Sequence, residues 1–186
     1  MAVEQPKYKV LSGDGDFQIR QYEPTIIAKT VVHSDHMDAA SNQGFRRIAG
    51  YIFGGNTSRS KIAMTAPVTS TPQQSEKIAM TAPVSMQGEP GSYTIAFTMP
   101  SKYTLETLPK PNDPLVTIEQ VPGRKMAVLK YSGTWSQERM ARKTRELLDR
   151  LAKEKLRPSG EILFARYDPP WTPWFMRTNE VQIVVE

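Results

Sequence analysis

The stretch FQIRQYEPTIIAKTVV, residues 17–32, decides the fold. It contains two runs of β-forming residues, Phe17–Tyr22 and Thr25–Val32, separated by Glu23-Pro24, which is typical of a turn. A similar arrangement follows 99 residues later, at Val116–Tyr131, where Pro122-Gly123 separates two further runs. We therefore predict two hairpins of antiparallel strands. At this offset the two copies share three identities, namely Ile19 with Ile118, Gln21 with Gln120, and Ala28 with Ala127.

Each predicted hairpin is followed by a predicted helix at the same offset. Residues 38–53 place Phe45, Ile48 and Ala49 on one face, and two glycines then end the helix. Residues 136–156 place Met140, Leu147, Leu148 and Leu151 on one face. Further strands are predicted at Tyr8–Ser12, Tyr93–Met99, Glu161–Tyr167 and Val181–Val185.

The long-range repetition predicts one domain over residues 1–186, built from half-repeats at about residues 8–100 and 115–186. Two helices would cover a strongly bent antiparallel sheet, in an α+β fold with a pseudo-two-fold axis. The cleft between the halves is then a natural ligand site.

The composition excludes several classes of site. The chain has no cysteine, which rules out disulfides, zinc thiolate sites, iron–sulfur clusters and a thiolate ligand to heme. Its sequence contains no phosphate-binding glycine loop, no nucleophile elbow and no HExxH motif, which favours a binding protein over an enzyme. No apolar run is long enough to span a membrane, and the first residues do not form a secretory leader, so we expect a cytoplasmic protein.

The net charge of +5 is only a mild sign of anionic partners. Many of the basic residues fall in 136–157, where acids are interleaved with them at a spacing of four, as in Glu138 and Arg142. This pattern favours a solvated helix face, and we do not expect nucleic acid to bind.

An octapeptide, KIAMTAPV, occurs without change at residues 61–68 and 77–84. We interpret it as a local tandem duplication, with one copy as a strand and the other in a neighbouring loop or edge strand. The proline inside each copy argues for an edge or bulged position.

The two histidines, His33 and His36, lie between a predicted strand and the first predicted helix. Imidazole is the commonest protein ligand of heme iron, and His36 is our candidate metal ligand. In the alternative interpretation, both are exposed polar residues in a loop that leads to a helix cap.

An aromatic loop lies between the last two predicted strands. Residues 168–176 hold Trp171, Trp174, Phe175 and Met176 among three prolines. Such rings close over a flat apolar ligand or cap the core, and the sequence supports both interpretations. A porphyrin would also need cations for its propionates, for which the candidates are Arg46, Arg47, Lys61, Lys77 and Arg177.

Several motifs together resemble the SOUL heme-binding family. They run in order from about residue 8 to the end of the chain: IRQYEP (19–24), YIFGGN (51–56), KIAMTAPV (61–68), FTMPS (97–101), YDPP (167–170) and RTNE (177–180).

The resemblance implies a distorted antiparallel β-barrel with two helices, similar to bacterial effector-binding domains. It also implies weak, non-covalent binding of heme or another tetrapyrrole in an apolar groove that involves the first helix and the aromatic loop. One histidine proposed as a ligand in the family falls where this chain has Gln21. We therefore expect Phe45, Ile48, Ala49, Trp171, Trp174 and Met176 to line the groove, with His33 or His36 as an optional ligand.

Two other functions remain open. The domain could be a general small-molecule effector-binding module for flat apolar cations, in which an acid such as Glu106 or Glu180 faces the pocket. It could also be an interaction protein that uses the basic helix at 136–156, in which case its binding would be sensitive to salt.

Overall fold

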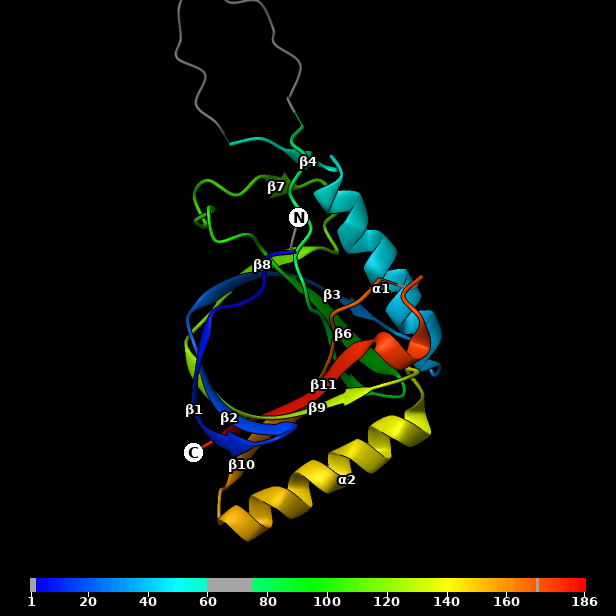
Figure 1. Cartoon of the computed structure of the whole chain (residues 1–186). Helices are drawn as coiled ribbons and strands as arrows, with labels where there is room; N and C mark the ends of the chain where they lie inside the picture. Colours follow the sequence, from blue (N-terminus) through cyan, green and yellow to red (C-terminus); the bar gives the residue numbers. More distant parts are fainter. Residues whose placement is uncertain (1–2, 60–74, 170) are drawn as a thin grey trace, which may run out of the picture.

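The computed structural model describes residues 3–59, 75–169 and 171–186. Its main element is a nine-stranded antiparallel sheet in the order β1-β2-β9-β11-β10-β5-β6-β3-β8, curled into a half-barrel (Figure 1). A two-stranded sheet pairs β4 with β7. The elements are β1 (Tyr8–Asp14), β2 (Phe17–Tyr22), β3 (Thr25–Val32), α1 (Met37–Ile52), β4 (Asn56–Thr57), β5 (Val84–Glu89), β6 (Ser92–Thr98), β7 (Lys110–Pro111), β8 (Thr117–Val121), β9 (Arg124–Ser132), α2 (Gln137–Glu154), β10 (Pro158–Arg166), the 3₁₀ turn η1 (Trp174–Met176) and β11 (Thr178–Val185).

The strand order has the predicted pseudo-two-fold symmetry. The strands β2, β3, β5 and β6 of the first half correspond, in that sequence, to β8, β9, β10 and β11 of the second half. Replacing each strand by its counterpart gives the same order from β2 to β8, read in the opposite direction. A helix follows β3 in one half and β9 in the other. The predicted α+β fold class is confirmed, whereas the residue limits of the two half-repeats stay a prediction.

The two predicted hairpins are wrong in their pairing. β2 pairs with β9, and β3 pairs with β8, so each strand pairs with a strand of the other half. Proline explains the difference, because tight hairpin turns need positive φ and Pro24 and Pro122 are held near −65°. The two short connections instead pass close together: a Cβ added at Gly123 would lie 2.9 Å from the carbonyl oxygen of Tyr22.

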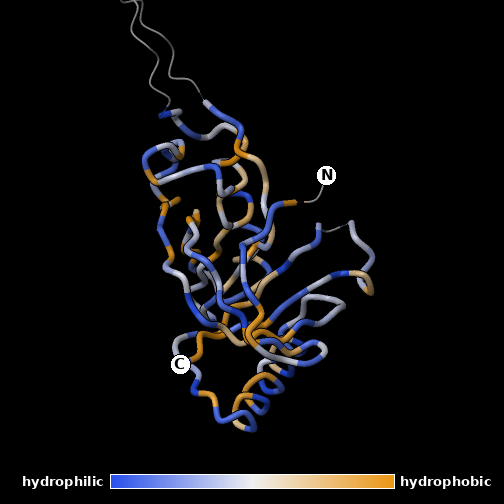
Figure 2. Tube along the Cα trace, turned by 60° about the vertical axis from the view of Figure 1, so that its left-hand side comes forward, coloured by the Kyte–Doolittle hydropathy of each residue, from blue (hydrophilic) through white to orange (hydrophobic). Residues whose placement is uncertain are grey.

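Two hydrophobic clusters form between the helices and the outer face of the sheet. α1 packs on β3 and β6, and α2 packs on β9, β10 and β11. Gly44 allows α1 to approach closely, since a Cβ there would meet the Ile95 side chain at 2.7 Å. α2 begins as expected at Ser136, whose hydroxyl accepts a bond from the Arg139 amide. Figure 2 shows the alternation of apolar and polar residues along α2.

The second octapeptide copy, residues 77–84, lies mostly outside regular secondary structure and does not form a strand. The Ile78 amide donates to the Ile52 carbonyl at 2.9 Å, and the Ile78 side chain is buried in the core. Thr81 forms a single bridge with Glu4, and only Val84 belongs to a strand. The first copy, at 61–68, lies outside the described residues.

Candidate functional site

The aromatic loop between β10 and β11 presents large apolar side chains to solvent. Trp171 is 83% exposed and Trp174 is 58% exposed, and both Phe175 and Met176 are exposed as well. The Trp174 and Phe175 rings meet edge to face at 5.7 Å. A surface that exposes four such side chains within six residues is typical of a binding site.

The base of the loop explains why these rings do not bury themselves. The Tyr167 amide donates to the Thr178 carbonyl at 3.2 Å, and the Thr178 amide donates to Asp168 Oδ2 at 2.5 Å. The Arg177 Nε also donates to the Thr172 carbonyl at 2.7 Å. These bonds close the loop where it leaves the sheet, and the four apolar side chains beyond them stay exposed.

The predicted residues of α1 divide between the surface and the core. Phe45 is partly exposed, and its ring lies 5.4 Å from that of Phe97. Ile48 is fully buried in the cluster beneath the helix, and Ala49 is buried as well. A ligand on the surface of α1 would therefore contact Phe45 but would reach Ile48 and Ala49 only if neighbouring side chains moved.

Both histidines are exposed, as the loop interpretation expects. The His33 Nδ1 lies 3.3 Å from the Gly91 carbonyl oxygen, which would leave Nε2 available to a metal. His36 occupies the N-cap of α1 and makes no side-chain capping bond there. Within residues 3–59, 75–169 and 171–186, no group of three or more His, Asp or Glu side chains could hold a metal ion.

Arg166 is a site residue that the sequence analysis missed. It lies at the end of β10, where the loop begins, and its guanidinium carbon stands 4.9 Å from the centre of the Trp135 ring. Burial, and then the charge of Arg177, lower the pKa of Arg166, while Asp38 in the first turn of α1 acts in the opposite sense. The loop base and the start of α1 are thus close enough for their charges to interact. Alternation along β10 could have revealed Arg166, since it falls on the same face as Phe164.

The inner face of the curled sheet carries a buried polar network. Arg20 and Glu180 form an ion pair at 2.9 Å, and both side chains are almost fully buried. Glu180 also accepts bonds from the Tyr167 hydroxyl and the Gln182 amide, each at 2.6 Å. Burial and the charge of Glu180 raise the pKa of Tyr22, which accepts a bond from Arg20. Glu180 therefore already has a cationic partner.

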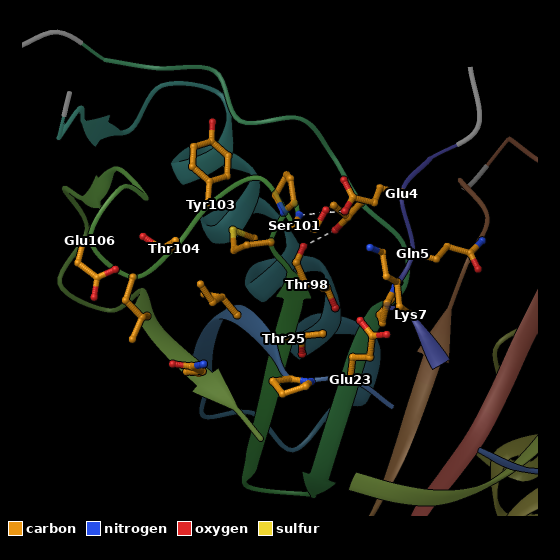
Figure 3. Close-up of a pocket in the computed structure, with 18 residues that line it drawn as sticks. Glu4, Gln5, Lys7, Glu23, Thr25, Thr98, Ser101, Tyr103, Thr104 and Glu106 are labelled. Atoms are coloured by element: carbon orange, nitrogen blue, oxygen red, sulfur yellow. Dashed lines mark hydrogen bonds between the residues drawn. The ribbon is translucent and has the colours of Figure 1, made fainter. Parts of the chain in front are cut away.

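Three cavities lie away from the predicted site residues, none of which lines them. One of about 350 Å³ fills part of the inner curl, beside Tyr167 and Gln182. Another of about 410 Å³ lies against α2. The third, of about 490 Å³, is shown in Figure 3, where Glu4 points toward Ser101 and accepts a bond from its amide at 2.9 Å. Glu106 lines this third cavity, together with Lys7 and Glu23.

No helix in the described part of the chain is both long and apolar enough to cross a membrane.

Comparison with known proteins identifies relatives over nearly the whole chain. The family model "SOUL heme-binding protein" matches residues 3–75 and 70–184. Heme-binding protein 2 of Homo sapiens is 31% identical over 200 residues, covering 98% of this chain and 86% of that protein. Heme-binding protein 2 of Mus musculus is 28% identical over 188 residues, with the same coverage of 98% and 86%.

Solved structures share the fold at low sequence identity. The EcmrR C-terminal domain matches with a TM-score of 0.66 and 9% identity, covering 96% of this chain and 98% of the domain. A structure described as a hydrolase from Listeria innocua matches with a TM-score of 0.59 and 12% identity, covering 92% of each chain. At these identities the likeness concerns the fold alone.

Proposed function

This chain belongs to the SOUL heme-binding protein family, and from that premise we propose that it binds heme or a related tetrapyrrole reversibly, as a carrier or buffer. Binding would be non-covalent, because the chain has no cysteine for a thioether link. The cytoplasmic location expected from the sequence remains part of this proposal.

The observation that carries the proposal is the exposed aromatic loop. A tetrapyrrole is a wide, flat, apolar ring, and the exposed faces of Trp171 and Trp174 offer it a stacking surface stiffened by prolines. Met176 and Phe45 would add apolar contacts at the edge of this surface. His36 or His33 would supply an optional imidazole to the iron, and both are accessible to it.

Titration with hemin, followed by the Soret absorption band, tests this proposal. We expect a saturable spectral shift at one hemin per chain. Replacing Trp171 and Trp174 together by alanine should weaken binding about tenfold or more, since each stacked ring contributes roughly 1–3 kcal/mol. Phe53→Ala is the matched control, because Phe53 is similarly exposed but lies at the far end of α1.

Two results would contradict parts of the proposal. Equal hemin affinity in the double tryptophan variant and the Phe53 variant would remove the loop from the site. An unchanged Soret position in His33→Ala and His36→Ala would remove the histidine ligands but leave the stacking surface intact.

The effector-binding alternative draws support from Glu106, which lines the cavity of about 490 Å³. A parallel titration with the flat aromatic cation ethidium separates the two functions. Saturable ethidium binding that Glu106→Gln abolishes, combined with weak hemin binding, would favour the alternative.

A further inference from the structure

Three neighbouring strands bring polar side chains into one row at the base of the aromatic loop. Tyr131 on β9 pairs with Asn179 on β11, and Asn179 pairs with Arg166 on β10. Residues paired in this way project from the same face of a sheet. This is the outer face, because Tyr131 belongs to the cluster beneath α2.

Several hydrogen-bond donors in and beside this row lack acceptors. The Tyr131 hydroxyl and the Trp135 Nε1 are buried without a partner, whereas the Asn179 amide donates to the Gly133 carbonyl at 3.1 Å. The side chain of Arg166, which lies over the Trp135 ring, makes no hydrogen bond or ion pair with the described residues. Of these donors, only the guanidinium of half-buried Arg166 can be reached by an acceptor from outside the chain, because the other two atoms have almost no exposed surface.

The charges around the row point to an anionic acceptor. The charges of Arg139 and Arg166 both act on Tyr131, and Arg177 lies close enough to Arg166 to repel it. Asp38 is the acid that acts on Arg166, but it lies beyond ion-pair distance. Arg166 and Trp135 are half-buried, so a ligand group can approach Arg166 from solvent while Tyr131 lies beneath.

We propose that Arg166, Trp135 and Tyr131, together called the loop-base cluster, bind a carboxylate of a ligand whose apolar body rests on the aromatic loop. The inference rests on the proposed function, where this carboxylate is a propionate of the tetrapyrrole. Arg166 would donate charge-assisted bonds to it, while the Trp135 ring holds the guanidinium in place. The aromatic loop and the cluster then form the apolar half and the anion-binding half of one site.

Hemin and hemin dimethyl ester separate the carboxylate contact from the ring contact. The ester keeps the ring and the iron but lacks the anionic oxygens. We expect the full-length protein to bind hemin about tenfold more tightly than the ester, the usual scale for a charge-assisted bond. Arg166→Gln should weaken hemin about tenfold and change ester affinity less than about twofold.

Further variants keep the test independent of folding. Arg166→Lys, which retains the charge, should recover part of the preference for hemin. Arg142→Gln is the matched control, since Arg142 is an exposed arginine on α2, and it should leave both affinities unchanged. Because the hemin-to-ester ratio is taken within one variant, partial loss of folded protein lowers both affinities together.

Several outcomes would overturn the inference. If the wild-type protein takes up hemin but binds the ester equally well, the loop-base cluster does not meet a propionate, although the proposed function stands. An Arg166-dependent rise in thermal stability with sodium acetate alone, with equal hemin and ester affinity, would make the cluster a site for free small anions. If the wild-type protein takes up neither porphyrin, the proposed function fails and the inference fails with it.

Discussion

Buried polar side chains in this protein are of two kinds: some have hydrogen-bond partners, and others have none. Arg20 and Glu180 are buried as a pair whose partners satisfy the carboxylate on both oxygens. The Tyr131 hydroxyl is equally buried but has no partner. A paired group costs little in the folded state, whereas an unpaired one lowers stability by its full desolvation penalty.

Two tyrosines allow this difference to be measured. Tyr131→Phe should stabilise the ligand-free protein by about 1 kcal/mol, because it removes an unsatisfied buried hydroxyl. Tyr51→Phe is the matched control, since the Tyr51 hydroxyl donates to the Pro109 carbonyl at 2.8 Å. That variant should lose about 1 kcal/mol in denaturant unfolding. A stability loss in Tyr131→Phe as large as in Tyr51→Phe would show that Tyr131 has a partner in solution.

At the level of elements, a helix is held in place by its apolar face, which packs against the sheet. α2 buries Met140, Leu147 and Leu151 against β9, β10 and β11 and leaves a charged face in solvent, where Lys143 pairs with Glu146 at 2.8 Å. Exposed pairs of this kind contribute little to stability, so the apolar face holds the helix in place.

Adjacent leucines on α2 test this assignment. Leu147 is fully buried, whereas Leu148 is 38% exposed. Leu147→Ala should cost about 2–5 kcal/mol of unfolding free energy, because it leaves a cavity beneath the helix. Leu148→Ala should cost roughly 1 kcal/mol or less, since solvent fills the space. Equal losses in chemical denaturation would mean that the helix is rotated relative to this structure.

At the scale of the whole molecule, strand exchange between the halves ties the domain into one sheet. Each half contributes a first strand to the other half, so neither half has a complete sheet of its own. The inside of this curled sheet carries Tyr22 and Tyr167, and the outer face carries Tyr131; burial raises the pKa of all three. Such groups link the stability of the whole domain to pH.

Alkaline pH should therefore destabilise the protein. Burial raises the pKa of Tyr131 from 10.0 to about 12, and burial also raises the pKa values of Tyr22 and Tyr167. Because the folded state holds these protons more tightly, its extra stability is fully present below pH about 10 and is lost as the pH rises through the folded pKa values. Thermal unfolding between pH about 9 and 12 should show a falling midpoint, and the decline should be shallower in Tyr131→Phe. A midpoint that stays constant across this range would contradict the burial of these phenols.

Only part of the candidate site could be predicted from the sequence, because sequence patterns are local and do not give contacts between distant residues. The prolines around Trp171 and Trp174 predicted a loop, but the sequence supported both a ligand-binding and a core-capping position for the rings, and only the structure exposes them. The burial of Ile48 could not be predicted from the sequence, because a helical pattern alone does not say which residues of the apolar face meet the sheet and which meet a ligand. Arg166 was missed because alternation along β10 indicates only its face of the sheet, whereas its neighbours Tyr131 and Trp135 come from β9 and from the connection that follows it.

The sequence by itself determined the two helices, most of the strands, their repetition at a fixed offset and the kinship of the chain. These features depend on local periodicity, on turn residues and on motifs, all of which are properties of neighbouring residues. Only the tertiary structure decided which strands pair. The sequence is compatible with a hairpin of β2 and β3, but in the structure each of these strands pairs with the other half, and the two proline connections contact each other at Gly123. It also decided which donors are left without acceptors, since that depends on side chains brought together from distant parts of the chain.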